Sequence, residues 1–419
     1  MATRSRFGAP DVRTAFLSVF AVASLAACAA RDPALSRAPV PPVTSGQLRA
    51  DEDPEGVTIV FSGEPSWKAS VSRRHGGALS RFHLPAEGPN LVHDGNNLFA
   101  GMFFMFLSSD KRDPSEEKRK EHHAKTTNWG KTKQATVRAA AIGPEEVVVD
   151  VNGDVTGWRM LGPSGEIVAR FTLRYSFRRD RIGVDGAVTW VYGHETQLGT
   201  LGLNHFFAPG SVNLPVRMAD ADTAALELPV TSSQGEKLPS VLSHPVRADL
   251  WLRNGRLIQL RTTSLPDGFK AAPVYFSERP WQQEWAETAG FISKQKIPVN
   301  QRVPFGYELL IPAELPRNAP PLATIAAPGR ALHHKPGDTV TLTGVARDRE
   351  EGALSPERLE WVIQKRGSEV PVLIGRGETV SLAIPGDAEE HEFQYVARLT
   401  ATDATGLSSI AFVTIAVAR

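Results

Sequence analysis

The chain has only one cysteine, Cys28, so an intrachain disulfide is excluded. It also lacks a dominant charge: the net charge of +1 gives no electrostatic reason to expect nucleic acid or a strongly anionic partner. After Cys28 no apolar run reaches the ~20 residues that a membrane-spanning helix needs. Phosphate-binding loops, dinucleotide fingerprints and serine nucleophile elbows are missing as well. A chain of 419 residues can instead be stabilised by burying a large core.

The first 27 residues have the pattern of a secretory leader. Three arginines precede residue 14, an apolar stretch covers 15–24, and small residues lead up to Cys28. The Leu-Ala-Ala-Cys tetrapeptide that ends at Cys28 resembles the lipobox of bacterial lipoproteins. The resemblance implies cleavage before Cys28, diacylation of its thiol (palmitate being a typical chain) and acylation of the new N-terminus. The alternatives are an ordinary signal peptide with an incidental cysteine, or a short membrane anchor.

The residue after Cys28 bears on the location. In the sorting scheme of Gram-negative lipoproteins, Asp at this position favours retention in the inner membrane, and this chain has Ala29. The resemblance therefore implies an outer-membrane lipoprotein that faces the periplasm or the outside, with the membrane as a partner through lipid. Residues 28–53 are rich in Ala, Pro, Arg and Ser without a hydrophobic period, which predicts a flexible tether.

Residues 54–315 carry the signature of strands. Short runs rich in β-branched and aromatic residues recur between Gly, Pro, Asn and Asp, and residues 169–177 alternate strictly between apolar and polar. This pattern predicts a large antiparallel β-sandwich. Residues 110–133, with eight basic and five acidic residues, interrupt it. We expect a short exposed helix or an inserted loop there, either a solvated face or a basic lip over a cleft.

Prolines between 312 and 321 stiffen a connection and predict a domain boundary. The remaining residues, 319–419, have the size of a sandwich of ~100 residues. They contain an alternating strand at Thr339–Gly344, Trp361 on a middle strand, and an Asp403-Ala-Thr-Gly turn. The segment looks like the polycystic-kidney-disease-type (PKD) and related immunoglobulin-like modules of bacterial surface proteins. The resemblance implies a spacer, adhesion or carbohydrate-associated module without chemistry of its own.

The larger segment resembles the galactose-mutarotase-like domains. Gly76–Pro85, followed by Pro89–Val92, is similar to their opening. Asn204-His205-Phe206-Phe207 looks like the stretch that carries the acid histidine in sugar epimerases of that fold. Residues 297–309 resemble the closing strand pair. The predicted fold class is therefore all-β, with a large antiparallel mutarotase-like sandwich followed by a smaller immunoglobulin-like one.

One departure from this family decides between chemistry and binding. Epimerisation at the anomeric carbon needs an acid on the ring oxygen and a base on the anomeric hydroxyl. The resemblance makes His205 the acid, but the place of the family's basic glutamate holds Asn300, whose amide cannot take the proton. Glu278, from a neighbouring loop, is the candidate to replace the family's glutamate as the base. The combination favours carbohydrate binding, or an altered chemistry, over sugar epimerisation. The enzyme alternative is a sugar epimerase or polysaccharide lyase that uses His205, with Arg81 and Tyr275 as further residues in a lyase.

The candidate sugar-binding or catalytic residues are therefore His205, Asn204, Glu278, Arg81 and Trp281. Trp281 enters because exposed indoles stack on the apolar faces of sugar rings. Three of the candidates have a plainer alternative: a hydrogen-bonded core histidine for His205, a surface ion pair for Glu278, and core or edge packing for Trp281. A third hypothesis, a structural or adhesion envelope protein, predicts no sugar site.

The sequence predicts no cofactor. Calcium is the alternative, because Asp348–Gly352 and Asp403 fall where some PKD-like domains bind it through oxygen ligands. The demands of turn conformation explain the same Asp and Gly residues. The adjacent histidine pairs, at 122–123 and 333–334, point to opposite faces of a strand and lack the spacing of a zinc site.

Overall fold

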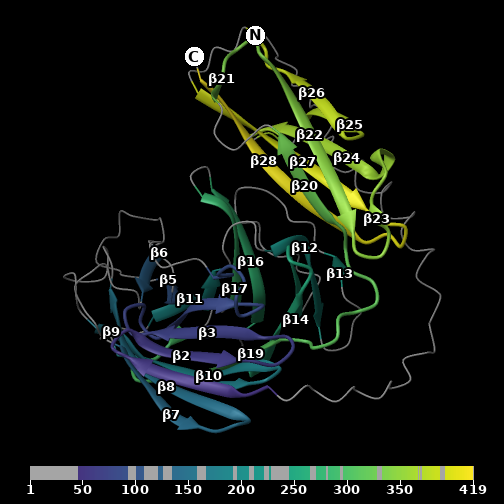
Figure 1. Cartoon of the computed structure of the whole chain (residues 1–419). Helices are drawn as coiled ribbons and strands as arrows, with labels where there is room; N and C mark the ends of the chain where they lie inside the picture. Colours follow the sequence, from purple (N-terminus) through teal and green to yellow (C-terminus); the bar gives the residue numbers. More distant parts are fainter. Residues whose placement is uncertain are drawn as a thin grey trace, which may run out of the picture. The chain divides into compact units, whose positions relative to one another are not determined.

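A computed structural model describes residues 46–92, 101–107, 121–125, 135–157, 167–191, 196–206, 212–220, 226–227, 245–264, 270–279, 282–292, 296–327, 333–366, 368, 370–386 and 392–418. These residues are almost entirely in β-strands (Figure 1). Within them, no helix is long and apolar enough to span a membrane. The prediction of an all-β, antiparallel fold is confirmed.

The first sheet is an antiparallel meander in the order β1-β2-β3-β4. Its strands are β1 (Leu48–Asp53), β2 (Gly56–Phe61), β3 (Trp67–Ser72) and β4 (Ala78–His83).

The predicted tether, residues 28–53, extends too far along the chain, because residues 48–53 form β1. Leu48 is buried, and the Asp53 carboxylate closes the hairpin to β2 by accepting hydrogen bonds from the backbone N–H groups of Glu55 (2.8 Å) and Gly56 (2.9 Å). The three successive acidic residues at the end of β1 are typical of a linker, and they led to the wrong boundary. An edge strand tolerates such charges, since one of its edges faces water.

The second sheet is larger. Its strands are β5 (Gly101–Leu107), β6 (Glu121–Lys125), β7 (Ala135–Ile142), β8 (Glu146–Gly157), β9 (Ile167–Arg178), β10 (Arg181–Trp190), β11 (Thr196–Phe206), β12 (Val212–Asp220), β13 (Leu226–Glu227), β14 (Pro245–Leu252), β15 (Leu257–Ser264), β16 (Lys270–Arg279), β17 (Gln282–Ile292), β18 (Lys296–Ile297) and β19 (Arg302–Leu310). One run has the order β8-β9-β10-β19-β15-β14-β12. A second run, β6-β5-β11-β17-β16, joins it where β6 pairs with β8.

Residues 121–125 differ from the expectation of a helix or loop, since they form β6 and pair with β5 and β8. Pairing on both sides satisfies the backbone of this strand and outweighs its charged composition. The rest of the interrupting segment lies outside the described residues.

The two sheets form a sandwich with one continuous core. Along β9 the predicted alternation is confirmed: residues 169, 171, 173, 175 and 177 are buried, whereas 170, 172, 174 and 178 are exposed. From the first sheet, Trp67 meets Phe61 and Phe177, with ring centroids 6.0 and 6.2 Å away. Its indole Nε1 donates a hydrogen bond to the carbonyl of Arg179 at 2.9 Å. Trp67 therefore ties the two layers together by packing and by a polar contact.

Two tyrosines lie inside this core. The Tyr175 hydroxyl donates a hydrogen bond to the carbonyl of Gly77 at 2.9 Å. Burial raises the pKa of both Tyr175 and Tyr307 above the ordinary value for a phenol. Both phenols therefore stay protonated near neutral pH and serve packing rather than proton transfer.

The C-terminal segment forms a smaller sandwich. Its elements are β20 (Leu322–Ala327), β21 (His333–His334), β22 (Thr339–Asp348), β23 (Gly352–Ala353), the 3₁₀ turn η2 (Pro356–Arg358), β24 (Leu359–Lys365), β25 (Pro371–Arg376), β26 (Thr379–Ala383), β27 (Glu392–Thr402) and β28 (Ser408–Ala418). One sheet contains β20, β22, β23 and β26, and the other contains β25-β24-β27-β28. The short β21 pairs with β28 in parallel, unlike the antiparallel pairs elsewhere.

Trp361 occupies the middle of this second core. It is fully buried, and its Nε1 donates a hydrogen bond to the carbonyl of Gly377 at 2.9 Å. Between the two sandwiches, residues 311–321 form no strand, as their prolines lead us to expect. The domain limits, 54–315 and 319–419, stay a prediction.

Candidate functional site

The face of the large sheet that points away from the core is polar and regularly charged. Three acid–arginine pairs lie directly across from each other on β8 and β9: Glu146–Arg178 at 3.0 Å, Asp150–Arg174 at 2.8 Å and Asp154–Arg170 at 3.7 Å. The pairs recur every four residues, and side chains separated by an even number share one face of a strand. This face therefore carries fixed charges of both signs in a row.

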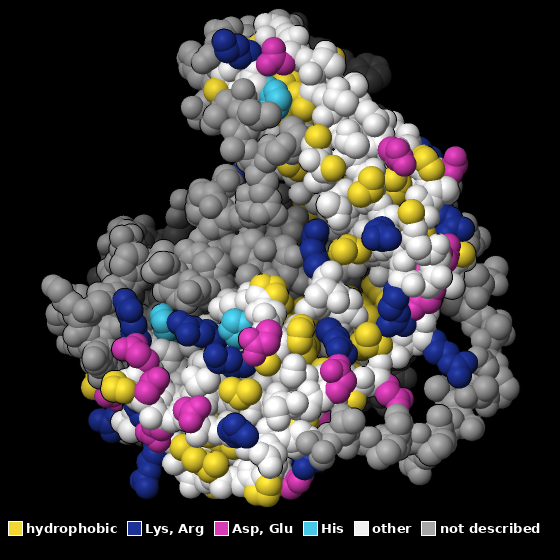
Figure 2. All heavy atoms as spheres, viewed as in Figure 1, with side chains coloured by type: hydrophobic (Ala, Val, Ile, Leu, Met, Phe, Trp, Pro, Cys, Tyr) yellow, Lys and Arg dark blue, Asp and Glu magenta, His cyan; other side chains and the backbone are white. Residues whose placement is uncertain are grey.

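Further pairs continue the pattern on the neighbouring strands. Arg181 and Arg261 approach the two oxygens of Glu308 at 3.4 and 3.6 Å, and Arg247 lies 3.2 Å from Asp249. On the side of the molecule drawn in Figure 2, basic and acidic side chains are likewise interspersed among the described residues. Charges of both signs so closely mixed agree with the small net charge of the chain.

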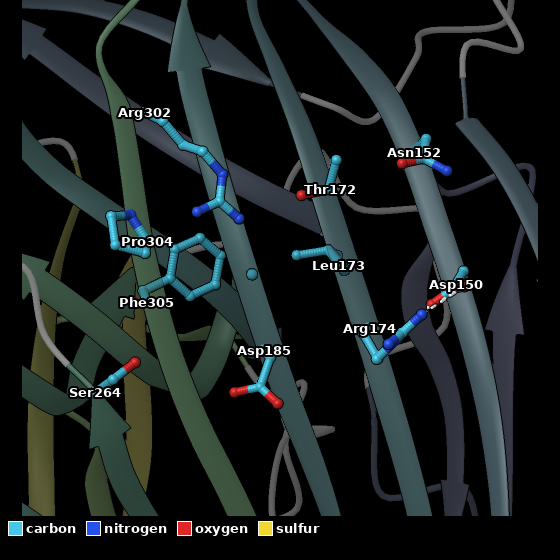
Figure 3. A pocket seen from close by; sticks show the side chains of 11 residues that line it. Asp150, Asn152, Thr172, Leu173, Arg174, Asp185, Ser264, Arg302, Pro304 and Phe305 are labelled. Carbon is cyan, nitrogen blue, oxygen red and sulfur yellow. Dashed lines mark hydrogen bonds and ion pairs between the residues drawn. The ribbon is translucent and has the colours of Figure 1, made fainter.

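A pocket of about 460 Å³ opens on the polar face of the large sheet (Figure 3). It draws on five strands, β8, β9, β10, β15 and β19. Its lining residues are Asp150, Asn152, Thr172, Leu173, Arg174, Asp185, Gly186, Ser264, Arg302, Pro304 and Phe305.

One side of the pocket is a bidentate ion pair. Arg174 Nε donates to Asp150 Oδ1 at 2.8 Å, and Arg174 Nη2 donates to Asp150 Oδ2 at 3.1 Å. This hydrogen bonding with Arg174 lowers the pKa of Asp150, and the same contact raises the pKa of Arg174. Since the Arg174 side chain is 61% exposed, water screens the pair and it contributes little to stability. Its main effect is to hold two charges in place.

The opposite side is built around a glycine. Gly306 pairs with Asp185 on one neighbouring strand and, across a register shift, with Ser264 on the other. A Cβ at Gly306 would lie 2.5 Å from Thr263 Oγ1, 2.8 Å from Ser264 Oγ and 3.2 Å from Asp185 Oδ1. Only glycine therefore fits, and its missing side chain leaves a carboxylate and two hydroxyls gathered around one small space.

The floor of the pocket is apolar for a related reason. Gly186 faces the core, where a Cβ would lie 2.3 Å from the Phe305 ring and 3.0 Å from Leu173. Because Gly186 has no side chain, these two residues line the pocket from beneath the sheet backbone. Above them, Arg302 extends from β19 over β10 toward Thr172 (Figure 3).

This arrangement suits a small polyhydroxylated ligand. Carboxylate oxygens accept hydrogen bonds from hydroxyls, while guanidinium, amide and hydroxyl groups donate to ring and hydroxyl oxygens. A small number of placed polar groups over an apolar floor is the usual make-up of a binding pocket. In the part of the chain that the structure describes, no three His, Cys, Asp or Glu residues converge as a metal site.

The predicted histidine and glutamate lie on the other run of the large sheet. Asn204 and His205 are on β11, and Glu278 is on β16, where the register with β17 shifts. His205 pairs with Thr288, which pairs in turn with Val274. Glu278 is four residues beyond Val274, roughly 13 Å along the strand. The backbone therefore does not set the two candidates directly opposite each other, and their side chains lie outside the described residues.

The other predicted residues have separate places. Arg81 is exposed on β4, in the first sheet, and does not line the pocket. Trp281 and Cys28 lie outside the described residues. Asn300 occupies an exposed turn just before β19, with φ at 65°. Asn adopts this left-handed conformation more readily than Glu, so the turn itself accounts for the amide at that position.

The turn explanation of the two C-terminal aspartates is supported by their contacts. Asp348 Oδ1 accepts hydrogen bonds from the backbone N–H groups two and three residues further on, at 2.8 and 2.7 Å. Asp403 Oδ1 does the same for the N–H groups two and four residues further on, both at 2.8 Å. Both carboxylates thus stabilise turns through Oδ1, as the turn explanation predicts. The Oδ2 atom of each is buried and has no hydrogen-bond partner among the described residues.

The pocket residues Asp185, Ser264 and Arg302 are absent from the sequence-based candidates. Two signals were available in the sequence. The acidic residues of 146–154 and the arginines of 170–178 share a four-residue period, and the polar positions of 170–176 alternate with apolar ones. Both identify a charged outer face. The pairing of β10 with β19 and of β19 with β15 brings the pocket residues together on that face, and the sequence does not reveal this pairing.

Comparisons with known proteins give likenesses of structure alone. No protein-family profile and no curated protein sequence matches the chain. Among solved structures, a polysaccharide lyase is similar at a TM-score of 0.32 and 9% identity, over 88% of this chain and 46% of the lyase. The protein Slr1438 from Synechocystis sp. PCC 6803 is similar at 0.38 and 9% identity, over 64% of this chain and 96% of its own. A candidate aldose 1-epimerase from Klebsiella pneumoniae is similar at a TM-score of 0.33 and 8% identity. The likeness covers 63% of this chain and 83% of the epimerase.

These TM-scores are too low to establish a shared fold or activity. The chain spans less than half the length of the polysaccharide lyase. Any function for this chain therefore has to be argued from its own residues.

Proposed function

We propose that this chain is an outer-membrane lipoprotein that binds carbohydrate in the pocket between Asp185 and Arg302. The observation that carries the proposal is the make-up of that pocket. Two carboxylates, two guanidinium groups and two hydroxyls line a space of about 460 Å³, together with the exposed apolar residue Pro304. Sugars offer the matching surface, because each ring has hydroxyl edges and apolar C–H faces.

The order of segments along the chain supports the same function. A lipid on Cys28 would anchor the N-terminus, and residues 29–47 would carry the sandwich away from the bilayer. The large sandwich would keep the mutarotase-like role of holding a sugar, and the C-terminal immunoglobulin-like sandwich would act as a spacer or adhesion module. Asn300 in place of the family's glutamate removes the expected base, so we propose binding without turnover.

Carbohydrate binding by the full-length protein on a glycan array, without chemical conversion of the bound sugar, is the expected result. Asp185→Asn keeps the shape of the pocket and removes one acceptor charge, so affinity should fall about tenfold, a change of ~1.4 kcal/mol. The matched control is Arg81→Gln on the first sheet, which should leave affinity unchanged.

Two outcomes would contradict the proposal. If no glycan binds at all, the chain has no sugar site and the structural or adhesion hypothesis stands. If a sugar is converted and His205→Ala abolishes the conversion, the protein is an enzyme that uses the β11 histidine instead.

The lipid anchor has its own test. Metabolic labelling with a fatty acid should mark the wild-type protein and fail to mark Cys28→Ala, because this chain offers no other thiol. Fractionation of the labelled cells should recover the protein with the outer membrane. Equal labelling of both proteins would exclude the anchor, and recovery with the inner membrane would exclude the proposed location.

A further inference from the structure

Arg302 carries the guanidinium of the pocket that has no ion pair within the described part of the chain. Six other arginines of this face lie within 4.0 Å of a carboxylate; they are Arg170, Arg174, Arg178, Arg181, Arg247 and Arg261. Arg138, opposite Asp150 on β7, has no such partner among the described residues either, but it does not line the pocket. Among the residues that the structure describes, no carboxylate reaches Arg302. Its guanidinium nevertheless lies in the pocket, over β10 (Figure 3).

Asp185 is the matching anion. Asp150, the other carboxylate of the pocket, already accepts two hydrogen bonds from Arg174. Asp185 accepts none from a described side chain, and Figure 3 shows its carboxylate standing clear of the other labelled residues. The absent side chain of Gly306 leaves room beside it. Asp185 interacts electrostatically with Arg174 but accepts no hydrogen bond from it. The pocket thus holds one cation without an ion pair and one anion without a hydrogen-bonding side chain among the described residues, at separate positions.

We propose that the pocket selects a sugar that carries a carboxylate, with the carboxylate on Arg302 and ring hydroxyls on Asp185 and Ser264. The proposal rests on the carbohydrate function proposed above and adds the class of sugar. A planar guanidinium matches the two oxygens of a carboxylate with two parallel N–H donors. A neutral sugar offers hydroxyl groups with one oxygen each, so no single group of it could accept from both parallel N–H donors of the guanidinium.

The separation of the two charges also orients the ligand. Hydroxyl donors are favoured at Asp185, whereas a carboxylate there would meet a like charge. The acidic group is therefore directed to the Arg302 end.

Calorimetric titration of the full-length protein with a galacturonate trisaccharide and with its methyl ester tests the proposal. The acid should bind about tenfold more tightly than the neutral ester, and raising the salt concentration should reduce that preference. Arg302→Gln should bring the affinity for the acid down to that for the ester, which itself changes little. Arg170→Gln is the matched control, an exposed arginine on the same face that does not line the pocket; its preference should equal that of the wild type.

The results separate this inference from the broader function. If acid and ester bind equally, or if the preference survives in Arg302→Gln, the acidic-sugar inference is wrong while carbohydrate binding stands. If neither trisaccharide binds and the glycan array is also blank, both proposals fail. A sulfated trisaccharide that binds as tightly as the acid would overturn the assignment to a carboxylate. Unchanged thermal unfolding midpoints exclude misfolding as the cause of any loss.

Discussion

Trp67→Ala should lower the free energy of unfolding of the large sandwich by about 3–5 kcal/mol, the usual cost of truncating a large aromatic in a core. Trp67 is fully buried and contacts aromatic rings from both sheets, Phe61 on one and Phe177 on the other. Its indole also satisfies the Arg179 carbonyl. The substitution therefore removes packing and a hydrogen bond between the layers together. Urea unfolding followed by circular dichroism measures the loss.

Two further variants locate the cause of that loss. Trp67→Phe keeps an aromatic ring and removes the indole N–H, so its destabilisation should be smaller than that of the alanine variant. Arg81→Ala, at an exposed position of the same sheet, should change stability by no more than about 0.5 kcal/mol. A loss below about 1 kcal/mol for Trp67→Ala would show that the two sheets are held together elsewhere.

Trp361→Ala should have an effect of similar size, about 3–5 kcal/mol, confined to the C-terminal sandwich. The Trp361 ring is so closely packed that a Cβ at Gly344 would lie 2.7 Å from its Cζ2 atom. Its Nε1 bonds the Gly377 carbonyl, which ties β24 to the loop before β26. Truncation would leave a cavity in the centre of this core and would remove the hydrogen-bond donor to the Gly377 carbonyl.

Differential scanning calorimetry on both tryptophan variants also tests the predicted domain limits. If residues 54–315 and 319–419 unfold separately, calorimetry shows two transitions. Trp67→Ala then lowers the midpoint temperature of the transition of 54–315, and Trp361→Ala lowers that of 319–419. Val372→Ala is the control for the smaller sandwich, because Val372 is 51% exposed on β25. If either variant moved both transitions equally, the two sandwiches would be a single cooperative unit and the limits would be wrong.

The fold class could be predicted because periodicity is local. In 169–177 a period of two separates the buried residues from the exposed ones, and the structure buries the predicted set. The same local reasoning failed for residues 48–53. Their charges indicate a linker, whereas pairing with β2 makes them an edge strand. Charge density does not report whether a backbone partner is present.

The candidate site was harder to predict than the fold, since family resemblance and geometry lead to different residues. The resemblance identified His205 and Glu278 on the β11–β16 run. The pocket instead collects Asp185, Ser264 and Arg302, which are separated by up to 117 residues in the sequence (302 − 185). No motif unites them, because each enters the pocket through the strand pairing of β10 with β19 and of β19 with β15.

The sequence by itself determined the chemical character of this protein: an all-β chain and an alternating polar face with fixed charges. The leader before Cys28 stays a prediction. These properties depend on residue type and near-neighbour spacing, which the sequence contains completely. Only the tertiary structure decided which of those charges are neutralised. Six arginines of the outer face lie within 4.0 Å of a carboxylate, whereas Arg138 and Arg302 have no such partner among the described residues, because strand register, a long-range property, sets each partner.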